Sequence, residues 1–416
     1  MKFKNSVAII TQEFPLYSNK GGIATFFGEL SDILSKNNHV FVVTKGPNKH
    51  KKNKLLNKYK EIIFPANKFR GKLTNFIFFR SPISLFFLLI KKFIPDTWEK
   101  IEWSFFACYW LKKIAPDIQI IHSCEYDFPY ICARLFFPRV KIIIHSESPQ
   151  LFLYKYVEYR WENLLKARIE LIGAQLFSNL IIACSSQLFE FWKKKGVRHI
   201  IMKPNFINTT FWNKTSQNHF FAKKNANVNI VFIGRLEYRK GVDRLLRIYT
   251  EYRKKYGETI SLHLIGKKTK TFPFKSSIID FDSFVKKYNI DPSFICVGQI
   301  NNKRTLKNYL SNLDGKVIYM HLARYEPNSL AIIEAMAFKL PILTTKEAGI
   351  DLIEDGKTGY FCPKSIKKAV EKLHQIIINW DYSKKAGENA QKYANSNLSK
   401  NNNLAFYKKI YNDLKI

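Results

Sequence analysis

The sequence predicts an α/β protein of two domains, each with a parallel sheet covered by helices. Its 416 residues exceed the size at which a single hydrophobic core stops growing. Short apolar runs alternate with helical patterns along the whole chain, which is typical of βαβ units over parallel sheets. We therefore expect two layered domains of similar construction.

The first domain is expected to open with a strand over residues 6–11, followed by a loop and a helix. The loop ends in a double glycine, Gly21 and Gly22, and a second strand is expected over residues 39–44. A double glycine alone is weak evidence for a site, because it is often only a flexible turn. Apolar residues at helical spacing predict the helix, namely Phe26, Phe27, Leu30, Ile33 and Leu34.

Two later strands of the first domain, residues 116–122 and 140–145, each end in a histidine. A histidine in such a place is more often a hydrogen-bonded structural group than a catalyst. From the residues alone, both interpretations stay open for His122 and His145.

Residues 229–246 indicate a buried strand, a tight glycine turn, a cationic loop and a helix, as in a phosphate-binding turn. Gly234 removes the side chain where the backbone must turn at the end of the strand. Arg235 offers a planar fork and Lys240 a point charge, the two cation types that hold phosphate oxygens. Lone basic residues in loops are usually only solvated, but these follow a strand directly, where open α/β sheets bind ligands.

Residues 325–338 predict a buried helix that contains one carboxylate, Glu334. An unpaired ionised carboxylate in so apolar a segment would cost several kcal/mol, so Glu334 needs a partner. That partner is either the hydroxyl groups of a ligand or a Lys or Arg from a neighbouring element. A second carboxylate, Glu326, precedes Pro327, where the helix is expected to begin. The pair would bracket a polyhydroxylated, anionic ligand.

The end of the chain predicts two more helices, over residues 366–380 and 401–416. Residues 213–229, rich in Asn and Lys and without apolar periodicity, are the expected linker between the domains. We place the first domain at residues 1–204, the second at 205–395 and a closing segment at 396–416.

These motifs resemble those of the retaining, nucleotide-sugar-dependent glycosyltransferases of family 4. The resemblance implies the GT-B fold, in which two Rossmann-like domains face each other across a donor-binding cleft. It also implies that residues 396–416 form a helix crossing back to the first domain. In that family a Gly-Arg-Leu-x-x-x-Lys-Gly stretch, matched here from Gly234, places its Arg and Lys on the donor diphosphate. The corresponding residues are Arg235 and Lys240.

The family's pair of glutamates separated by seven residues is matched by Glu326 and Glu334. In relatives the first contacts the transferred sugar, the second contacts the ribose hydroxyls, and backbone amides between them approach the diphosphate. This implies backbone donors at Asn328, Ser329 and Leu330. A helix start does offer free N–H groups and a favourable dipole to phosphate.

The resemblance also decides between the histidines. Relatives carry a Gly-Gly pair that lets the donor approach the backbone, which implies this role for Gly21 and Gly22. His145 matches a histidine that faces the reacting sugar, so we assign it to the site and treat His122 as structural. The expected catalytic residues are His145, Arg235, Lys240 and Glu326, and the expected donor-binding residues are Gly21, Gly22, Gly234, Asn328, Ser329, Leu330 and Glu334.

The sequence departs from the family pattern in several places. Residues 204–206 are Pro-Asn-Phe rather than Pro-Asn-Gly, and Pro327 and Asn328 follow Glu326 where a Phe-Gly pair is usual. Lys339 stands where a glycine is common. None of these changes removes a charge that the transfer needs, so we interpret them as divergence in specificity.

No metal site or cofactor is expected, because the donor is itself a substrate, a UDP- or GDP-linked sugar. Asp280 and Asp282 are spaced like a metal-binding pair of another glycosyltransferase fold. They are more simply explained as acids in the first turn of an amphipathic helix. The six cysteines form no closely spaced ligand pair, and the amino terminus lacks a secretory signal. We expect free thiols in a reducing cytoplasm.

The charge balance indicates a large anionic partner, since 68 Lys and Arg face 33 Asp and Glu, a net charge of +35. Residues 49–113 carry 13 Lys and 2 Arg against 4 acids, interleaved with aromatic side chains. The most apolar stretch, residues 83–90, is shorter than the about 20 residues of a spanning helix. Amphipathic segments of this kind can lie in the lipid headgroup layer, where each cation adds on the order of 1 kcal/mol. Alternatively, the aromatics fill the first domain's core.

The resemblance implies transfer of a sugar, with retention of its anomeric configuration, to a glycan or lipid-linked acceptor. Bacterial cell-surface polysaccharide or glycolipid biosynthesis, at the inner face of the cytoplasmic membrane, is the expected setting. One alternative is a catalytically inactive GT-B scaffold that docks on membranes or on a partner enzyme. The other is a nucleic-acid-binding protein, which we do not expect because residues 49–113 show no recognition-module signature.

Overall fold

The structure is a computed structural model that describes most of the chain. The described residues are 6–15, 21–45, 60–64, 92, 95–125, 128–149, 151, 161–213, 228–257, 260–274, 277–300 and 302–414. The chain divides into two compact units, Met1–Pro204 with Asn403–Ile416, and Asn205–Asn402. The second unit thus extends past residue 395, where the sequence had placed its end.

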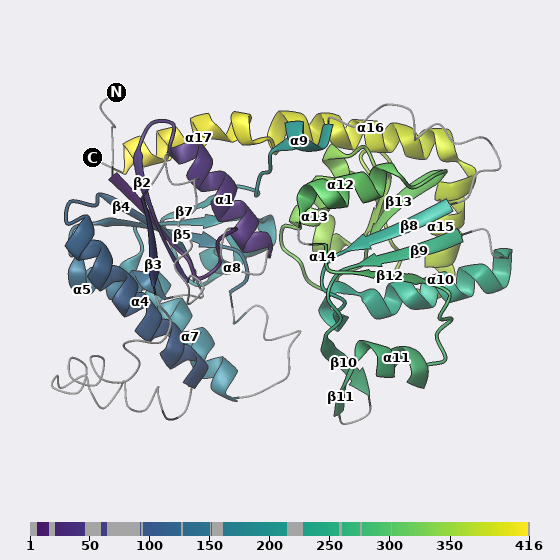
Figure 1. The fold of residues 1–416 in the computed structure, drawn as a ribbon, viewed down its shortest axis with the longest axis horizontal. Coiled ribbons are helices and arrows are strands. Elements are labelled where there is room, and N and C mark those ends of the chain that lie inside the picture. Colours follow the sequence, from purple (N-terminus) through teal and green to yellow (C-terminus); the bar gives the residue numbers. More distant parts are fainter. Residues whose placement is uncertain are drawn as a thin grey trace. The chain divides into compact units, whose positions relative to one another are not determined.

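The first unit is built on a parallel sheet with the strand order β3-β2-β1-β4-β5-β6-β7 (Figure 1). From β1 to β3 each new strand is added on one side of the sheet. From β4 to β7 each new strand is added on the opposite side. Ligands of such sheets bind where this reversal occurs, at the carboxyl ends of the central strands. The strands are β1 (Ser6–Ile10), β2 (His39–Lys45), β3 (Lys60–Phe64), β4 (Ile120–Cys124), β5 (Lys141–Ser146), β6 (Leu180–Ala183) and β7 (Ile200–Met202).

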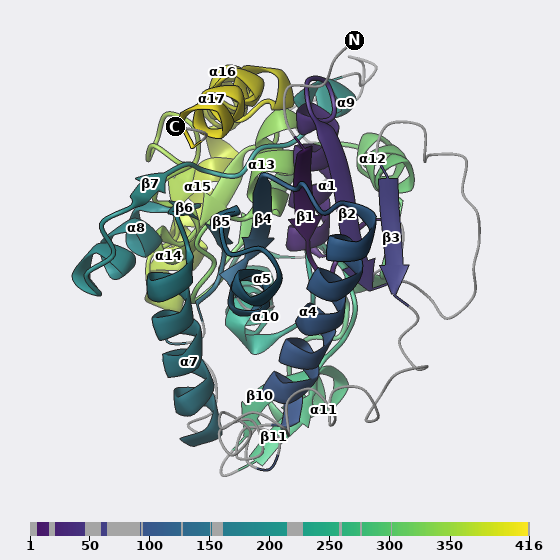
Figure 2. The same ribbon diagram turned by 90° about the vertical axis from the view of Figure 1, so that its left-hand side faces the viewer.

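Helices cover both faces of this sheet. Helices α4 (Pro95–Ile114), α5 (Pro129–Phe136) and α7 (Trp161–Phe177) lie together on one face (Figure 2), where Ala8 and Ile10 of β1 join their buried core. Helices α1 (Gly22–Leu34) and α17 (Lys400–Asp413) lie on the other face, where Phe27 and Tyr411 contact His122 of β4. Helix α8 (Ser186–Lys194) links β6 to β7. Side chains along each strand alternate between the two faces, so both faces need an apolar cover.

The second unit has a parallel sheet with the order β12-β9-β8-β13-β14-β15. Its switch point lies between β8 and β13, in the same relation as β1 and β4 in the first sheet. This unit therefore offers a second crevice at the carboxyl ends of its central strands. The strands are β8 (Val228–Ile233), β9 (Ile260–Ile265), β12 (Ile295–Gly298), β13 (Lys316–His321), β14 (Ile342–Thr344) and β15 (Tyr360–Phe361).

Two groups of helices cover the second sheet. Helices α10 (Val242–Tyr256) and α15 (Ile366–Ile378) share a core with alternate residues of β8, β9 and β13. Helix α13 (Leu330–Ala337) packs with α9 (Thr209–Asn213) and α16 (Trp380–Asn397). Shorter elements complete the unit, namely η2 (Tyr238–Lys240), the antiparallel hairpin of β10 (Lys270–Phe274) and β11 (Ser277–Asp280), α11 (Phe281–Lys287), α12 (Lys303–Ser311) and α14 (Lys346–Gly349).

Several expected boundaries differ from the structure. The helix expected from Pro327 begins at Leu330, because Ser329 is its N-cap. The helix expected over residues 366–380 ends at Ile378, and α16 begins at Trp380. Of the expected linker, residues 214–227 lie outside the described residues. Asp280 does open a helix, since its carboxylate accepts the Ser283 N–H of α11 at 2.9 Å.

Candidate functional site

The loop between β8 and α10 is shaped by glycine. Gly234 ends the strand at a φ of 150°, and Gly241 adopts a φ of 73° just before α10. A Cβ on Gly241 would lie 1.8 Å from the carbonyl oxygen of Leu322, the residue after β13. Only glycine permits both this backbone conformation and this close approach. The two glycines thus hold the cationic loop against the carboxyl end of β13.

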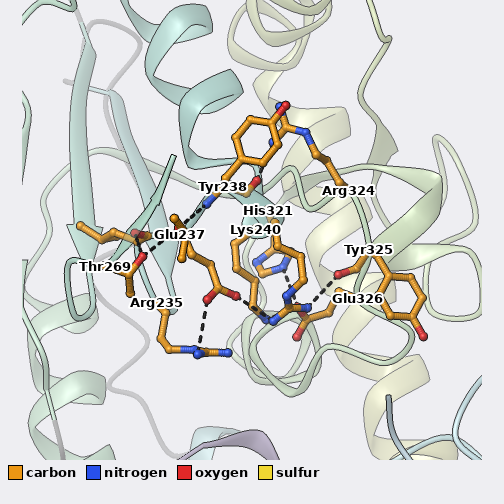
Figure 3. A network of polar contacts seen from close by, with 12 residues as sticks. Arg235, Glu237, Tyr238, Lys240, Thr269, His321, Arg324, Tyr325 and Glu326 are labelled. Carbon is orange, nitrogen blue, oxygen red and sulfur yellow. Dashed lines mark hydrogen bonds and ion pairs between the residues drawn. The ribbon is translucent and has the colours of Figure 1, made fainter. Parts of the chain in front are cut away.

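The centre of the site is the carboxylate of Glu326, which follows β13 (Figure 3). The Lys240 ammonium donates to it, and the Arg239 guanidinium lies 3.3 Å away. Arg239 also donates to the Tyr325 carbonyl at 2.9 Å and to the Glu237 carboxylate at 2.7 Å. These groups come from two loops more than eighty residues apart in sequence, at the switch point of the second sheet.

Burial and charge act against each other in this cluster. Burial works to raise the pKa of Glu326, but Lys240 and Arg239 outweigh it, and the pKa falls to about 2. Burial lowers the pKa of Lys240 although Glu326 opposes the shift. For Arg239, burial lowers the pKa, while Glu326 and Glu237 more than compensate and raise it. At neutral pH the carboxylate and the guanidinium are therefore charged.

Arg235 does not join the carboxylate of Glu326. Its guanidinium lies 3.4 Å from Glu237, and its side chain is 63% exposed. Figure 3 shows it on the Glu237 side of the cluster. An exposed guanidinium can turn towards a ligand at little cost, so the structure places Arg235 at the rim and Lys240 in the interior.

Two aromatic side chains of β13 line the same site. The Tyr319 hydroxyl lies 3.1 Å from His321 Nδ1, and His321 Nε2 lies 4.0 Å from the Glu326 carboxylate. Burial lowers the pKa of His321 to about 3, so the imidazole is neutral at pH 7. Burial raises the pKa of Tyr319, and the charges of Glu326 and Glu334 raise it further. Both carboxylates therefore act on one buried hydroxyl.

Glu334 is paired with a lysine from a neighbouring element. Its carboxylate lies 3.1 Å from the Lys303 ammonium, at the start of α12. The side chain of Glu334 is 12% exposed and that of Lys303 is 38% exposed. The partner that α13 requires is thus supplied by the protein, on a side that remains open to solvent.

The start of α13 carries unsatisfied polar groups. Asn328 Oδ1 accepts the Asn205 N–H at 3.2 Å. The other side-chain atom, Asn328 Nδ2, and the Ser329 hydroxyl are buried and have no hydrogen-bond partner among the residues that the structure describes. The Ser329 side chain accepts no hydrogen bond from the first N–H groups of the helix, which begin with Leu330. Buried donors of this kind indicate a place for an acceptor-rich ligand.

The expected site residues of the first unit lie at the start of α1 and the end of β5. Gly21 is the N-cap of α1, where a Cβ would lie 2.9 Å from a Glu13 carboxylate oxygen, and Gly22 is its first residue. The His145 ring is buried and stacks on Phe26 of α1, with ring centroids 3.9 Å apart.

The two histidines of the first sheet have different surroundings. His145 Nε2 lies 3.4 Å from the Glu147 carboxylate. His122 Nδ1 lies 2.6 Å from the Tyr411 hydroxyl of α17, and burial, then the charge of His145, lowers the pKa of His122 well below its usual range. The His122 ring therefore connects β4 with α17, and its structural role stays a prediction.

Sequence reasoning missed several members of the cluster. Arg239 precedes Lys240 directly, and nothing local to the sequence distinguishes a buried guanidinium from a solvated one. His321 ends an apolar strand, the signal that drew attention to His122 and His145, and it would have been found in the same way. The strand expected over residues 116–122 is in fact β4, Ile120–Cys124, so His122 lies in its middle. Arg324 was also missed, although it donates to both oxygens of Asp243 at 2.7 Å.

Within the basic and aromatic residues 49–113, the structure describes strand β3, residue 92 and helix α4. Trp98 and Phe105 are buried in the core of the first unit, and Trp103 and Phe106 pack against that core. Trp110 is exposed. For this helix the core-filling interpretation accounts for most aromatics, while most of residues 46–94 lie outside the described residues. In the described residues, no helix combines the length and apolar character that crossing a membrane requires.

Comparison with known proteins finds a family model that matches part of the chain. Residues 214–393 match the model of the family described as glycosyl transferases group 1. A probable sucrose-phosphate synthase of Thermosipho melanesiensis is 27% identical over 164 residues, 39% of this chain and 36% of that protein. An uncharacterized glycosyltransferase of Methanocaldococcus jannaschii, MJ1069, is 23% identical over 421 residues, 95% of each protein. Two other curated relatives are matched over about a third of their length or less.

Among solved structures, Anabaena HepE in complex with UDP-glucose superposes with a TM-score of 0.66 and 15% sequence identity. The match covers 97% of this chain and 99% of that chain. At this identity the likeness shows the fold, and the expectation of a GT-B fold with two Rossmann-like units is confirmed.

Proposed function

We propose that this protein transfers a sugar from a nucleotide-sugar donor to a glycan or lipid-linked acceptor, because residues 214–393 match the model of the glycosyl transferases group 1. The observation that carries the proposal is the cluster of Lys240, Arg239 and Glu326 at the switch point of the second sheet. A cationic loop, a buried carboxylate and a helix start with unsatisfied donors are what a diphosphate joined to a sugar requires.

The donor is a UDP- or GDP-linked sugar in this proposal. Anabaena HepE, which shares the fold, was solved with UDP-glucose. Arg235 and Lys240 would bind the diphosphate together with the backbone N–H groups of Asn328, Ser329 and Leu330. Glu326 would bind the transferred sugar, and Glu334 would exchange Lys303 for the ribose hydroxyls. Gly234 keeps the loop narrow enough for this approach.

The transfer breaks the bond between the anomeric carbon and a diphosphate oxygen, and it forms a bond from that carbon to the acceptor oxygen. Negative charge grows on the leaving diphosphate, and preorganised cations stabilise this charge most effectively where water is excluded. Lys240 and Arg239 are held in place by Glu326 before the donor arrives. A diphosphate oxygen would then take the acceptor proton, and the sugar would keep its anomeric configuration.

In the first unit, we propose that Gly21 and Gly22 let the donor approach the backbone and that His145 faces the reacting sugar. The environment of His145 supports a fixed ring, because Phe26 stacks on it and Glu147 lies 3.4 Å from its Nε2. A ring held on both sides keeps one orientation towards a substrate. No metal or other cofactor enters this proposal.

The acceptor is proposed to belong to bacterial cell-surface polysaccharide or glycolipid biosynthesis. The net charge of +35 supports an anionic membrane surface as a partner, at the inner face of the cytoplasmic membrane. Sedimentation with vesicles that contain anionic lipid, but not with neutral vesicles, is the expected result. Equal sedimentation with both, or with neither, contradicts this part of the proposal.

A panel of UDP- and GDP-sugars tests the central proposal. The correct donor should raise the unfolding temperature in proportion to its affinity, and release of the nucleoside diphosphate should require an acceptor extract. Stabilisation without turnover in any extract would instead identify an inactive scaffold. If no nucleotide sugar stabilises the protein, the proposal is wrong.

A further inference from the structure

The cationic loop is tied to the segment that leads from β9 into the β10–β11 hairpin. The N–H groups of Gly234 and Leu236 donate to the carbonyls of Ile265 and Lys267, both at 2.9 Å. A Cβ on Gly266 would lie 1.8 Å from the Gly234 carbonyl oxygen, so only glycine allows the two backbones to come this close. The loop and the hairpin segment therefore run side by side where both strands end.

Two threonine hydroxyls continue this connection. The Thr269 hydroxyl donates to the Leu236 carbonyl at 2.7 Å, and Thr271 Oγ1 accepts the Tyr238 N–H at 3.1 Å. The two hydroxyl oxygens are 3.0 Å apart. Figure 3 shows Thr269 beside the loop, next to Glu237 and Tyr238.

The direction of donation follows from the proton count. A hydroxyl has one proton, and Thr269 uses its own on the Leu236 carbonyl. Thr271 must therefore donate to Thr269, and its oxygen remains free to accept the Tyr238 N–H. A single relay runs from Tyr238 through Thr271 and Thr269 to Leu236, and each bond in such a chain polarises the next.

This relay holds both peptide groups of Glu237. The Leu236 carbonyl belongs to the peptide before Glu237, and the Tyr238 N–H belongs to the peptide after it. The Glu237 carboxylate in turn lies 3.4 Å from Arg235 and 2.7 Å from Arg239. Fixing the two peptides fixes the direction of this carboxylate, and with it the placement of both guanidinium groups.

The opposite side of the loop is held separately. Arg324 donates to the Tyr238 carbonyl and forms a two-point ion pair with Asp243, and its guanidinium lies 3.6 Å from the centre of the Tyr238 ring. These contacts restrain Tyr238 from the side of β13. They do not reach the peptide before Glu237. The carbonyl of that peptide accepts from the Thr269 hydroxyl, and its N–H donates to the Arg235 carbonyl at 2.9 Å.

We propose that Thr269 and Thr271 are positioning residues for the donor diphosphate, acting through Glu237 on Arg235 and Arg239. This inference rests on the proposed function of the same site. Neither threonine contacts the donor in this scheme, and the methyl groups have no part in it. Serine should therefore replace threonine at both positions, whereas valine, which has the same shape without the hydroxyl, should not.

The test compares Thr269→Val and Thr271→Val with the double variant Thr269→Ser, Thr271→Ser. Each valine variant should raise the donor KM, and the Kd for UDP or GDP, roughly three- to tenfold, with a smaller change in kcat. The double serine variant should stay within about twofold of the unmodified protein. Thr210→Val is the matched control, because Thr210 is an exposed residue whose Oγ1 bonds only the Asn208 side chain among the described contacts.

Amide hydrogen exchange at Tyr238 gives a readout independent of donor. Thr271→Val should accelerate this exchange, while Thr271→Ser should leave it slow. If the unmodified protein binds nucleotide and the valine variants bind it equally well, the positioning role is wrong and the proposed function stands. If the unmodified protein binds no nucleotide, the proposed function is wrong, and the role of the two threonines in donor binding is then wrong as well. Unchanged Tyr238 exchange in Thr271→Val would refute the relay itself.

Discussion

The ammonium of Lys303 lies 3.1 Å from the carboxylate of Glu334, where a ribose is proposed to bind. Since the lysine side chain is 38% exposed, a ligand can displace it at modest cost. Glu334→Ala should therefore weaken UDP or GDP binding about tenfold, because hydrogen bonds to a charged group contribute roughly 1.5–3 kcal/mol. Calorimetric titration measures this, and Glu354→Ala, which breaks an exposed pair with Lys357, is the control. Unchanged nucleotide affinity in Glu334→Ala would exclude the ribose role.

Arg235 is expected to matter for turnover and not for stability. Its side chain is 63% exposed, so Arg235→Ala should leave the unfolding temperature unchanged. Turnover should fall about a hundredfold, the size of effect seen when one group that stabilises a developing negative charge is removed. Arg247→Ala on the outer face of α10, where the arginine lies over the Tyr288 ring, is the matched control. Equal activity in the two variants would show that Arg235 does not contact the donor.

Variants of Lys240 and Glu326 are expected to lose and regain stability while their turnover stays lost. Lys240→Met should destabilise the protein by about 3 kcal/mol in denaturant unfolding, because it leaves a buried carboxylate one cation short. Adding Glu326→Gln removes that charge and should restore most of the stability. Turnover should stay lost in both variants. Activity regained in the double variant would mean that neither group takes part in the transfer.

His321 is expected to make the protein sensitive to acid. Burial lowers its pKa to about 3, whereas the unfolded chain takes up this proton near pH 6.5. The unfolded state therefore binds more protons between these values, and stability falls as the pH drops from 6.5 towards 3. The loss is at most on the order of 5 kcal/mol. His321→Gln should flatten this slope in unfolding experiments, while His199→Gln, at an exposed ring, should keep it.

Two glycines with similar backbone angles are expected to differ in their tolerance of alanine. Gly196 has a φ of 83° and open space around it, whereas Gly241 has a φ of 73° and the Leu322 carbonyl where a Cβ would stand. Gly196→Ala should cost only the left-handed strain of about 1 kcal/mol. Gly241→Ala should cost at least about 3 kcal/mol more, since the backbone of the cationic loop must move away from β13. A similar loss of stability in Gly196→Ala and Gly241→Ala, measured by thermal unfolding, would contradict this account of the loop.

Local patterns predicted the strands and glycine turns well. The strand before Gly234, the helix after Gly241 and the helix that carries Glu334 all form near the expected positions. Their signals are apolar periodicity and residues with special backbone freedom, which act over a few neighbours. The start of α13 was placed three residues early, because the backbone after Pro327 is still extended at Ser329, the N-cap position.

Lys339 illustrates a departure from the family pattern with a structural cost. The resemblance led us to expect a glycine there, and Lys339 adopts a φ of 62° just after α13. A residue with a Cβ pays strain in this left-handed region. Lys339 therefore holds a backbone conformation that glycine adopts more readily.

The sequence by itself determined the two α/β units, the cationic loop and the two carboxylates. Apolar periodicity, the positions of glycines and the charged residues are local properties of the chain. Only the tertiary structure decided the pairing: Arg239 rather than Arg235 meets Glu326, and Lys303 meets Glu334. Thr269 and Thr271 likewise reach the loop only because β8 and β9 lie side by side. Such contacts depend on which distant segments the packed sheet brings together, and no neighbour in the chain encodes them.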